Sequence, residues 1–397
     1  METFMEIKGF KFSAVKAAIK KPGRLDLGLI FSETPAKVAA LFTTNGVKAA
    51  PVLLSMERAG NGTAQAVLVN SGNANACTGQ QGMDDARESC RLVAEGLGIP
   101  DEAALVASTG VIGVPLPMER IRRSIPPLIE GLATGTLADL ATAIMTTDTF
   151  PKLELRSGQA GGKPYTIAGI AKGAGMIMPN MATMLAFMVT DAAVEQAWLD
   201  RIFREANSAS FNAITVDGDT STNDTALILA NGAADNVPLG NGNADAAHFA
   251  ELLNNLMLTL ARQLIKDGEG ATKFVTITIK GAVSAAEARQ AAMAVANSSL
   301  VKTAFFGQDA NWGRILAAVG YSGARIDPGR AWLWFDDVVM AKNGVFAGGD
   351  AEARGTAVLK NREFAVTVDL KLGDGKATVY TTDLSSDYVK INADYRT

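Results

Sequence analysis

The chain has 397 residues, of which 48% are hydrophobic and 20% charged, and its 37 basic and 41 acidic residues give a formal net charge of −4. These proportions are typical of a globular protein with roughly two or three packed units, and they exclude a disordered chain. There is no run of Lys or Arg interleaved with aromatic residues and no stretch near the about 20 consecutive apolar residues that cross a bilayer, so nucleic acid and membranes are not expected partners.

The N-terminal segment METFMEIKGFKF lacks the basic start and the apolar core of a signal peptide, which predicts a cytoplasmic protein. Cys77 and Cys90 are the only cysteines. In a large chain of that compartment, two thiols are expected to be small buried side chains without a disulfide between them.

Strand and helix patterns then alternate along the chain. The segment AVLVNSG (66–72) predicts a buried strand that ends in a small polar turn. Two apolar stripes at helical spacing predict helices, the second of which ends near Lys266. The first stripe consists of Val194, Trp198, Ile202, Phe203 and Ala206, and the second of Phe249, Leu252, Leu253, Leu256 and Leu260.

The C-terminal third contains the clearest strands. KFVTITIKG (273–281) alternates and places Val275, Ile277 and Ile279 on one face. EFAVTVDLKL and KATVYTTDL flank Gly373-Asp374-Gly375, which predicts a hairpin. Gly/Asn-rich residues 231–243 and Gly/Asp-rich residues 347–355 predict surface loops and possible unit boundaries.

These patterns predict the fold class. No repeat of about 20 to 50 residues occurs, which argues against a solenoid or propeller. Strands, hairpins and helices follow one another without a strict βαβ rhythm. We therefore expect an α/β protein of the α+β type, a layered sandwich of mixed or antiparallel sheets covered by helices.

The single histidine, His248, excludes many chemistries. A histidine-rich metal site cannot be built within one chain, there is no HExxH, and no paired CxxC supplies thiolates. His248 opens a helical stripe, where a surface or capping role is expected.

Several short motifs resemble ligand loops without completing them. DGDTSTND (217–224) begins like a calcium loop but has Thr222 in place of the turn glycine and Ile228 in place of the bidentate glutamate, so a turn of self-capping side chains is expected. SGQAGGKP lacks the first glycine and the final Ser or Thr of a phosphate loop, and KGAGMI lacks the third glycine of a dinucleotide fingerprint. No metal or cofactor is predicted.

A chain without histidine bases can still activate a hydroxyl through an α-amine. If the chain breaks between Ala182 and Thr183, the new terminus carries a hydroxyl and a base whose pKa is about 7.7 to 8.0. The methionine-rich segment MIMPNMATMLAFMVTD (176–191) would offer an apolar pocket around it. The same segment also has the sequence of a buried strand in which methionines fill the core, and the pattern alone favours that alternative.

Seven long blocks of the sequence, in one order and over essentially the whole chain, carry a more specific signal. They are VNSGNANACTG (69–79), STGVIGVPLPM (108–118), MTTDTFPK (145–152), KGAGMIMPNMATMLAFMVTDA (172–192), DGEGATKF (267–274), FGQDANWGRILAAVGYSG (306–323) and INADYRT (391–397). Together they resemble the ornithine acetyltransferase family, the glutamate N-acetyltransferases of arginine biosynthesis.

The resemblance implies a set of catalytic residues. Thr183 matches the nucleophile, which self-cleavage after Ala182 exposes. The products are an α chain (1–182) with the oxyanion residues and a β chain (183–397) with the nucleophile at its N-terminus and a C-terminal unit that closes over the site. Thr109 and Gly110 match the pair that stabilises the oxyanion, although an isolated STG would be interpreted as an ordinary turn.

The resemblance also implies substrate contacts. The matching positions are Thr146 or Thr147, Lys172, Thr183, Glu269, Asn392 and Thr397. A lysine can pair with the carboxylate of an N-acetyl amino acid, and a carboxylate can hold the ammonium group of the product. Taken alone, Lys172 would be a solvated loop lysine, Glu269 an exposed acid after a helix, and the C-terminal residues a frayed tail.

The family implies an enzyme that moves acetyl from N2-acetylornithine to glutamate by double displacement, without a cofactor; some members also use acetyl-CoA. It further implies the α/β sandwich shared with related self-processing aminopeptidases, and a dimer of cleaved αβ units or larger. Two alternatives stay open. One is a self-processing amidase or aminopeptidase with water as the acceptor, and the other is a binding protein in which 176–191 is inert core.

Overall fold

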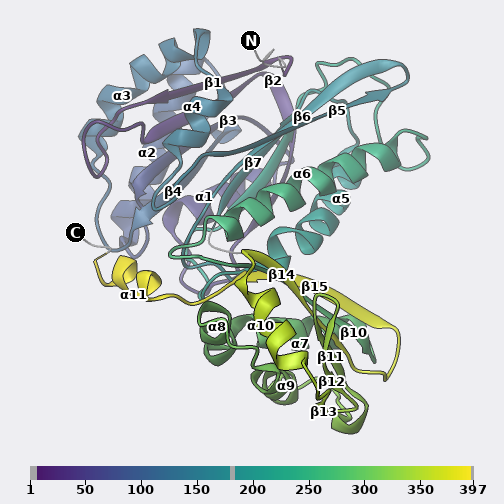
Figure 1. Ribbon diagram of the computed structural model, residues 1–397. Coiled ribbons are helices and arrows are strands. Elements are labelled where there is room, and N and C mark those ends of the chain that lie inside the picture. Colours follow the sequence, from purple (N-terminus) through teal and green to yellow (C-terminus); the bar gives the residue numbers. More distant parts are fainter. Residues whose placement is uncertain (1–6, 179–183, 395–397) are drawn as a thin grey trace. The chain divides into compact units, whose positions relative to one another are not determined.

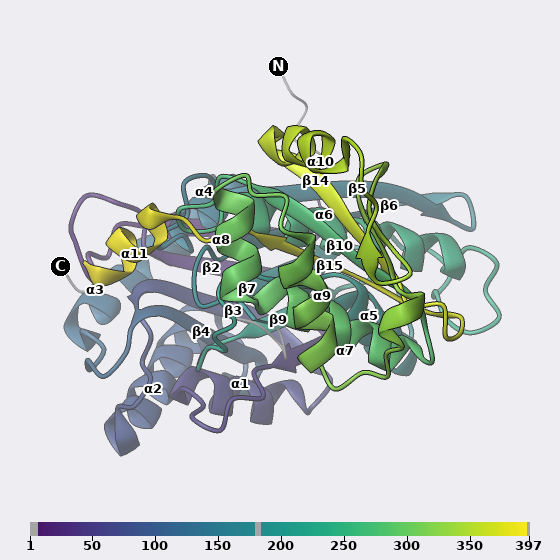
Figure 2. The same cartoon turned by 60° about the horizontal axis from the view of Figure 1, so that its bottom comes forward.

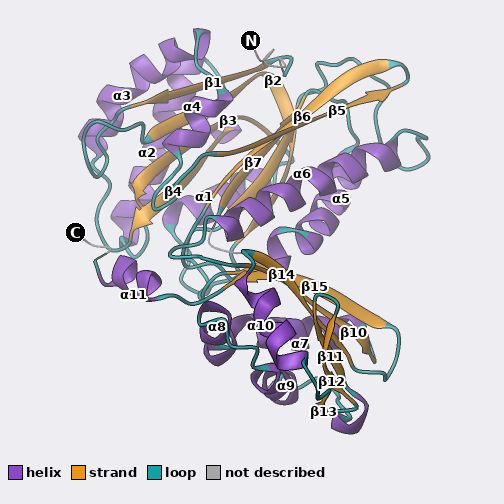
Figure 3. Cartoon of the chain, viewed as in Figure 1, coloured by secondary structure: helices purple, strands orange, loops and turns teal. Residues whose placement is uncertain are grey.

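A computed structural model describes residues 7–178 and 184–394 and divides the chain into two compact units. Unit 1 comprises Met1–Asn212 and Asp219–Leu264, and unit 2 comprises Ala213–Gly218 and Ile265–Thr397. Each unit contains one mixed sheet with helices (Figures 1 and 3), which confirms the predicted fold class. The predicted boundaries are wrong, because residues 231–243 lie within unit 1 and residues 347–355 within unit 2.

The sheet of unit 1 has the strand order β4-β3-β2-β9-β7-β6-β5, with β1 paired to β2. The pairs β3 with β4 and β7 with β9 are parallel, and the others are antiparallel. The predicted strand at 66–72 is confirmed within β3. The strands are β1 (Phe10–Val15), β2 (Leu27–Phe42), β3 (Thr63–Asn73), β4 (Ala104–Val111), β5 (Lys152–Ala160), β6 (Lys163–Lys172), β7 (Leu185–Thr190) and β9 (Thr225–Ala230).

Helices cover both faces of this sheet. Alternate residues of β3 point to opposite faces, so that Leu68 joins a cluster with α2 and α3, whereas Val67 joins a cluster with α4. At Gly169 of β6, an added β-carbon would lie 2.7 Å from the Leu256 side chain, so α6 packs directly against that strand. The helices are α1 (Ala50–Ala59), α2 (Gly79–Leu97), α3 (Met118–Glu130), α4 (Leu137–Ala143), α5 (Gln196–Ala209) and α6 (Ala246–Lys266).

Both predicted helical stripes are observed, with two exceptions. Val194 lies outside α5 and forms an isolated bridge with Leu239, because Glu195 is extended and α5 begins only at Gln196. In α6, Leu252 is half-buried, whereas the other predicted stripe residues are fully buried. His248 is in the first turn of α6 with its side chain 55% exposed, which confirms the predicted surface position.

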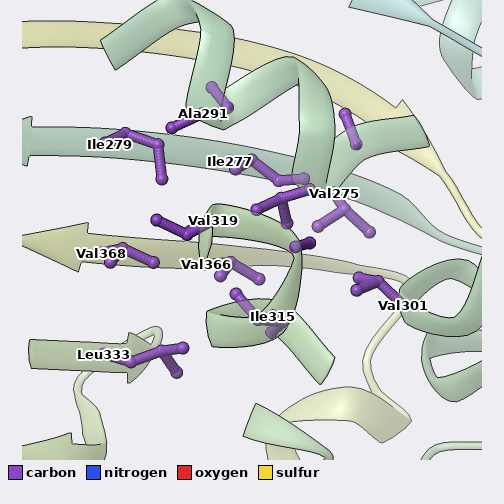
Figure 4. Close-up of a cluster of buried hydrophobic side chains, with 14 of the residues drawn as sticks. Val275, Ile277, Ile279, Ala291, Val301, Ile315, Val319, Leu333, Val366 and Val368 are labelled. Atoms are coloured by element: carbon purple, nitrogen blue, oxygen red, sulfur yellow. The ribbon is translucent and has the colours of Figure 1, made fainter. Parts of the chain in front are cut away.

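The sheet of unit 2 has the strand order β13-β12-β11-β14-β10-β15-β8. Val275, Ile277 and Ile279 of β10 share one fully buried face and pack against Ala291 of α7 (Figure 4), as their alternation predicts. The helix α7 lies against β10 and β15 (Figure 2). The strands are β8 (Ile214–Thr215), β10 (Phe274–Ala282), β11 (Trp332–Phe335), β12 (Val338–Lys342), β13 (Val345–Phe346), β14 (Glu363–Asp369) and β15 (Gly375–Thr382). The helices are α7 (Ala285–Asn297), α8 (Ser299–Phe306), α9 (Trp312–Tyr321), α10 (Ala351–Lys360) and α11 (Ser386–Ala393).

The hairpin predicted around Gly373-Asp374-Gly375 is wrong. The strands β14 and β15 both form, but β10 lies between them, parallel to β14 and antiparallel to β15. The link from β14 to β15 passes around the end of β10, where the Leu372 amide donates to the Gly281 carbonyl. A glycine-rich segment therefore indicates that the chain reverses its direction, but it does not determine which strands pair. The predicted loop 347–355 is also too long, because α10 begins at Ala351.

The two cysteines differ in exposure. Both are free thiols, Cys90 being buried and Cys77 exposed, so the prediction of two buried cysteines is wrong for Cys77. Cys77 has a φ of +57° in the turn between β3 and α2. Among the described residues, no helix combines the length and the apolar character that a membrane span requires.

Candidate active site

The predicted oxyanion residues lie at the end of β4, in a strand and not in an ordinary turn. The hydroxyl of Ser108 donates to Asn70 Oδ1 at 2.6 Å, which joins this strand to the end of β3. Gly110 has a φ of +135°, and an added β-carbon would lie 2.3 Å from the backbone carbon of Gly72. Only glycine fits this close approach of two strands. Thr109, the residue before this glycine, is only 9% exposed.

Lys172 joins two of the other predicted residues. It ends β6 and is only 4% exposed, so the interpretation as a solvated loop lysine is wrong. Its Nζ donates to Thr146 Oγ1 at 2.7 Å and to Thr109 Oγ1 at 3.3 Å. Of the two adjacent threonines, Thr146 is thus the one whose hydroxyl contacts the lysine. Three residues that are far apart in the sequence form one polar cluster inside unit 1.

Asp148, which sequence reasoning missed, organises this cluster. Its Oδ1 accepts from Lys152 Nζ at 2.8 Å and from the Gly173 amide at 2.7 Å, and its Oδ2 lies 4.0 Å from Lys172 Nζ. Burial alone would raise the pKa of Asp148, but the charges of Lys172 and Lys152 hold it at about 2. The available sequence signal was an acid directly after two candidate threonines and four residues before a lysine.

The substitution Asp148→Asn should therefore lower the free energy of unfolding of unit 1. The Lys152 side chain has no exposed surface, and removal of one partner from a buried ion pair costs about 3–5 kcal/mol in the free energy of unfolding. Urea denaturation of the wild type and the variant measures this. The matched control is Asp235→Asn, which breaks the exposed pair with Lys163 and should leave stability nearly unchanged.

The same ion pair predicts a pH dependence. The folded pKa of Asp148 lies below the unfolded value of about 3.9, so its contribution is complete above that pH and is lost as the pH falls toward about 2. The difference in stability between the wild type and Asp148→Asn should shrink over that range. A difference that is the same at pH 3 and pH 7 would contradict this account of Asp148.

The turn that carries Thr146 is attached to β3. The hydroxyl of Ser71 donates to the Ala143 carbonyl at 2.7 Å, at the end of α4. Arg24 donates to Ser71 Oγ at 3.1 Å and also to the Met145 carbonyl. The blocks 69–79 and 145–152, which are distant in the sequence, are thus neighbours in unit 1.

Ala182 and Thr183 lie outside the described residues, so the scissile bond and the nucleophile stay predictions. The next residue, Met184, is buried. Leu185 opens β7 and pairs with Lys172 of β6. All six residues of β7 are buried, as the interpretation of 176–191 as a buried strand predicts for that part. The described chain therefore resumes in the strand adjacent to Lys172.

The other predicted substrate residues belong to unit 2. Glu269 is only 8% exposed, so the interpretation as an exposed acid is wrong. Its Oε2 accepts from Asn392 Nδ2 at 2.8 Å. Asn392 lies in α11, which is a helix and not the frayed tail that the sequence alone suggests. Thr397 lies outside the described residues.

The segment around Glu269 is held by the chain that follows β15. Asp383 Oδ1 accepts from the Thr272 amide at 2.8 Å, and the hydroxyl of Ser385 donates to the Gly270 carbonyl at 2.6 Å. Lys302, buried nearby, donates to Thr381 Oγ1 at 2.9 Å, and burial lowers its pKa to about 7. No pattern in the sequence around Lys302 indicates that this lysine is buried.

The described residues contain no group of three or more histidine, cysteine or acidic side chains placed to hold a metal ion. The calcium-like segment instead makes contacts within the protein. The hydroxyl of Thr222 donates to the side-chain Oδ1 of Asn223, and the backbone N–H of Asn223 donates to Ser221 Oγ at 3.0 Å. These contacts confirm the predicted self-capping turn.

The sequence matches the ArgJ family model over residues 11–397. It is 72% identical over 393 residues to the arginine biosynthesis bifunctional protein ArgJ of Geobacter sulfurreducens, covering 99% of this chain and 100% of that protein. The protein of the same name from Syntrophotalea carbinolica is 54% identical over 394 residues, with 99% and 100% coverage. A crystal structure of the arginine biosynthesis bifunctional protein ArgJ from Bacillus halodurans is similar with a TM-score of 0.51 and 39% identity, covering 52% of this chain and 97% of that chain.

Proposed function

Because the chain belongs to the ArgJ family, we propose that it is a glutamate N-acetyltransferase of arginine biosynthesis, which moves the acetyl group from N2-acetyl-L-ornithine to L-glutamate. The observation that carries the proposal is the 72% identity over 99% of the chain to a relative named for arginine biosynthesis. The polar cluster of Thr109, Thr146 and Lys172 supports it, because these contacts bring three of the predicted residues together.

The proposed mechanism is a double displacement on Thr183. Self-cleavage after Ala182 yields the α chain (1–182) and the β chain (183–397) and frees the α-amine of Thr183. This amine takes the proton of the Thr183 hydroxyl as the oxygen attacks the acetyl carbonyl. The tetrahedral intermediate then expels the amine of ornithine, which leaves with the proton, and an acetyl ester stays on Thr183. The amine of glutamate attacks that ester and restores the free hydroxyl.

Thr109 and Gly110 are proposed to stabilise the oxyanion. A threonine hydroxyl has one proton to donate and can accept as well. Because Lys172 donates to Thr109 Oγ1, the hydroxyl proton of Thr109 must point elsewhere, and it is available to a developing negative charge. The Gly110 amide is the proposed second donor, as the family resemblance implies.

Lys172 is proposed to pair with a substrate carboxylate and Glu269 with a substrate ammonium group. Asn392 supports Glu269 by donating to its Oε2. By resemblance, Thr146 or Thr147, together with Thr397, complete the substrate contacts. The proposal further includes acetyl-CoA as a second donor, since the relatives are named bifunctional, as well as a cytoplasmic location and an assembly of two or more αβ units.

N-terminal sequencing and an acceptor test examine the proposal together. Purified protein should contain a fragment that begins TMLAFMV, and it should release ornithine from N-acetylornithine rapidly only when glutamate is present. Rapid release without glutamate would favour the self-processing amidase. A single uncut band in a preparation without transfer activity would favour the binding protein.

A further inference from the structure

The loop that precedes β9 contains two buried polar side chains whose contacts reach beyond the loop. Asn223 is 6% exposed and Asp224 is 1% exposed. Burial of polar groups is costly unless they are hydrogen-bonded. The Asn223 side chain bonds to backbone groups of Ala74 and Ser108, and Asp224 Oδ1 bonds to the Met184 backbone. We propose that Asn223 and Asp224 are positioning residues that fix the segment after the nucleophile and the oxyanion segment relative to each other. The inference rests on the proposed function. It assigns a role to residues of the segment DGDTSTND (217–224), to which the proposed function gives none.

Asn223 holds the backbone immediately before the predicted oxyanion residues. Its Nδ2 donates to the Ser108 carbonyl at 2.9 Å and to the Ala74 carbonyl at 2.6 Å. Both partners can only accept, so the amide has one possible orientation, which the hydroxyl of Thr222 reinforces by donating to Oδ1. Because Thr109 directly follows Ser108, the Asn223 side chain helps to position the end of β4.

Asp224 holds the residue immediately after the predicted nucleophile. Its Oδ1 accepts from the Met184 amide at 3.0 Å, and the amide of Thr225 donates to the Met184 carbonyl at 3.1 Å. On its other side, the carbonyl of Asp224 accepts from the Thr43 amide at 3.0 Å, at the end of β2. Met184 is thus bonded through both of its peptide groups.

The carboxyl of Asp224 accepts the Met184 amide in a buried position, where the charged form is disfavoured. Burial raises its pKa well above the usual range, more than its hydrogen bonds and the charge of Lys172 lower it. A neutral side chain of the same shape should therefore replace it. This distinguishes Asp224 from Asp148, whose charge balances two lysines.

The two contacts matter together because the residues are consecutive. Neighbouring Cα atoms are about 3.8 Å apart, so the side chain bonded to the Ser108 carbonyl and the side chain bonded to the Met184 amide stand on adjacent residues of one covalent backbone. Acyl transfer requires the attacking oxygen and the oxyanion donors to keep a fixed separation, and a misplacement of about 1 Å can cost a factor of about 100 in rate. Loss of either contact should therefore lower kcat and leave ground-state binding largely intact.

The test compares alanine and conservative variants in the full chain. Asp224→Ala and Asn223→Ala should lower kcat by about 10- to 100-fold, with the KM for N-acetylornithine changed by less than about 3-fold. Asp224→Asn keeps an acceptor for the Met184 amide and should recover kcat to within about 3-fold of the wild type. Denaturing gels and thermal melts establish the cut, folded fraction to which each rate refers. If Asn223→Ala does not fold, Asn223→Asp replaces it, because aspartate keeps the shape of asparagine and removes the amide donors.

Asn236→Ala is the matched control. Asn236 is equally buried in unit 1 and bonds backbone groups of Ala193 and Val237, away from the cluster of Lys172. It should lower stability without lowering kcat of the folded fraction. The inference is overturned if Asp224→Ala and Asn223→Ala keep the kcat of the wild type, if Asn236→Ala loses as much, or if Asp224→Asn is as impaired as Asp224→Ala.

Hydrogen exchange separates this inference from the proposed function. Peptides that contain Met184 and Ser108 should exchange faster in the alanine variants than in the wild type and in Asn236→Ala. If the wild type transfers no acetyl group, the proposed function fails, and unchanged exchange would then overturn the two contacts as well. If the wild type transfers acetyl and only the variants behave otherwise than expected, the inference fails alone.

Discussion

Thr183→Ala should leave the chain as one polypeptide of 41.4 kDa and abolish acetyl transfer at the same time. The proposal gives one residue two duties, because its hydroxyl is the nucleophile and its α-amine, once freed, is the base. Removing a nucleophile of this kind lowers kcat by several orders of magnitude, about 10⁶-fold in the best-studied serine case. Denaturing gels report cleavage, and release of ornithine from N-acetylornithine in the presence of glutamate reports transfer.

Thr183→Ser is the matched control for this experiment. Serine keeps a hydroxyl beside the future α-amine and lacks only a methyl group, so the variant should still cut itself and retain part of its transfer activity. Normal processing of Thr183→Ala would refute the assignment of the nucleophile. A Thr183→Ala chain that stays whole and yet transfers acetyl at the normal rate would refute the role of the freed amine.

The elements that the sequence predicts well are those whose burial pattern is local. The alternation of Val275, Ile277 and Ile279 predicts both the strand and its buried face, because side chains of a strand alternate between its faces. The partners of a strand are not a local property. Gly373-Asp374-Gly375 predicts a reversal of the chain, but the place between β14 and β15 is taken by β10, about 90 residues earlier in the chain.

The site residues come from the resemblance and not from local patterns. A lysine before a glycine-rich turn, such as Lys172, is ordinarily solvated, and nothing within its own segment shows that it is buried. Its burial depends on Asp148, which lies 24 residues earlier and balances its charge. Sequence patterns report solvent exposure only where the compensating partner is close in the chain.

For the acidic segment 217–224 as well, the sequence predicts only the contacts that are local in the chain. Its composition predicts a self-capping turn, and the contacts among Ser221, Thr222 and Asn223 confirm it. The bonds to Ser108 and Met184 are invisible to that pattern, because their partners are backbone groups that any sequence presents. A residue that recognises backbone leaves no mark on the sequence of its partner.

Thr109→Val should lower kcat by about 10²- to 10³-fold with little change in the KM for N-acetylornithine, because one of the two proposed donors to the oxyanion is lost and the proposed substrate contacts remain. Valine is β-branched like threonine and lacks the hydroxyl, and Lys172 keeps its shorter bond to Thr146 Oγ1. Steady-state rates on the cut protein measure the effect. Gly110→Ala is less informative, because the added β-carbon would press on Gly72 and shift the strand.

Thr109→Ser is the matched control, because it keeps the hydroxyl and should retain most of the wild-type kcat. If the serine and valine variants lose activity equally, the methyl group and its packing matter, and the hydroxyl does not stabilise the oxyanion. The proposed self-cleavage would also pass through a tetrahedral intermediate at a carbonyl carbon. If the same donors serve both reactions, uncut precursor should accumulate in Thr109→Val and not in Thr109→Ser. Normal cleavage with impaired transfer would instead assign the Thr109 hydroxyl to acetyl transfer alone.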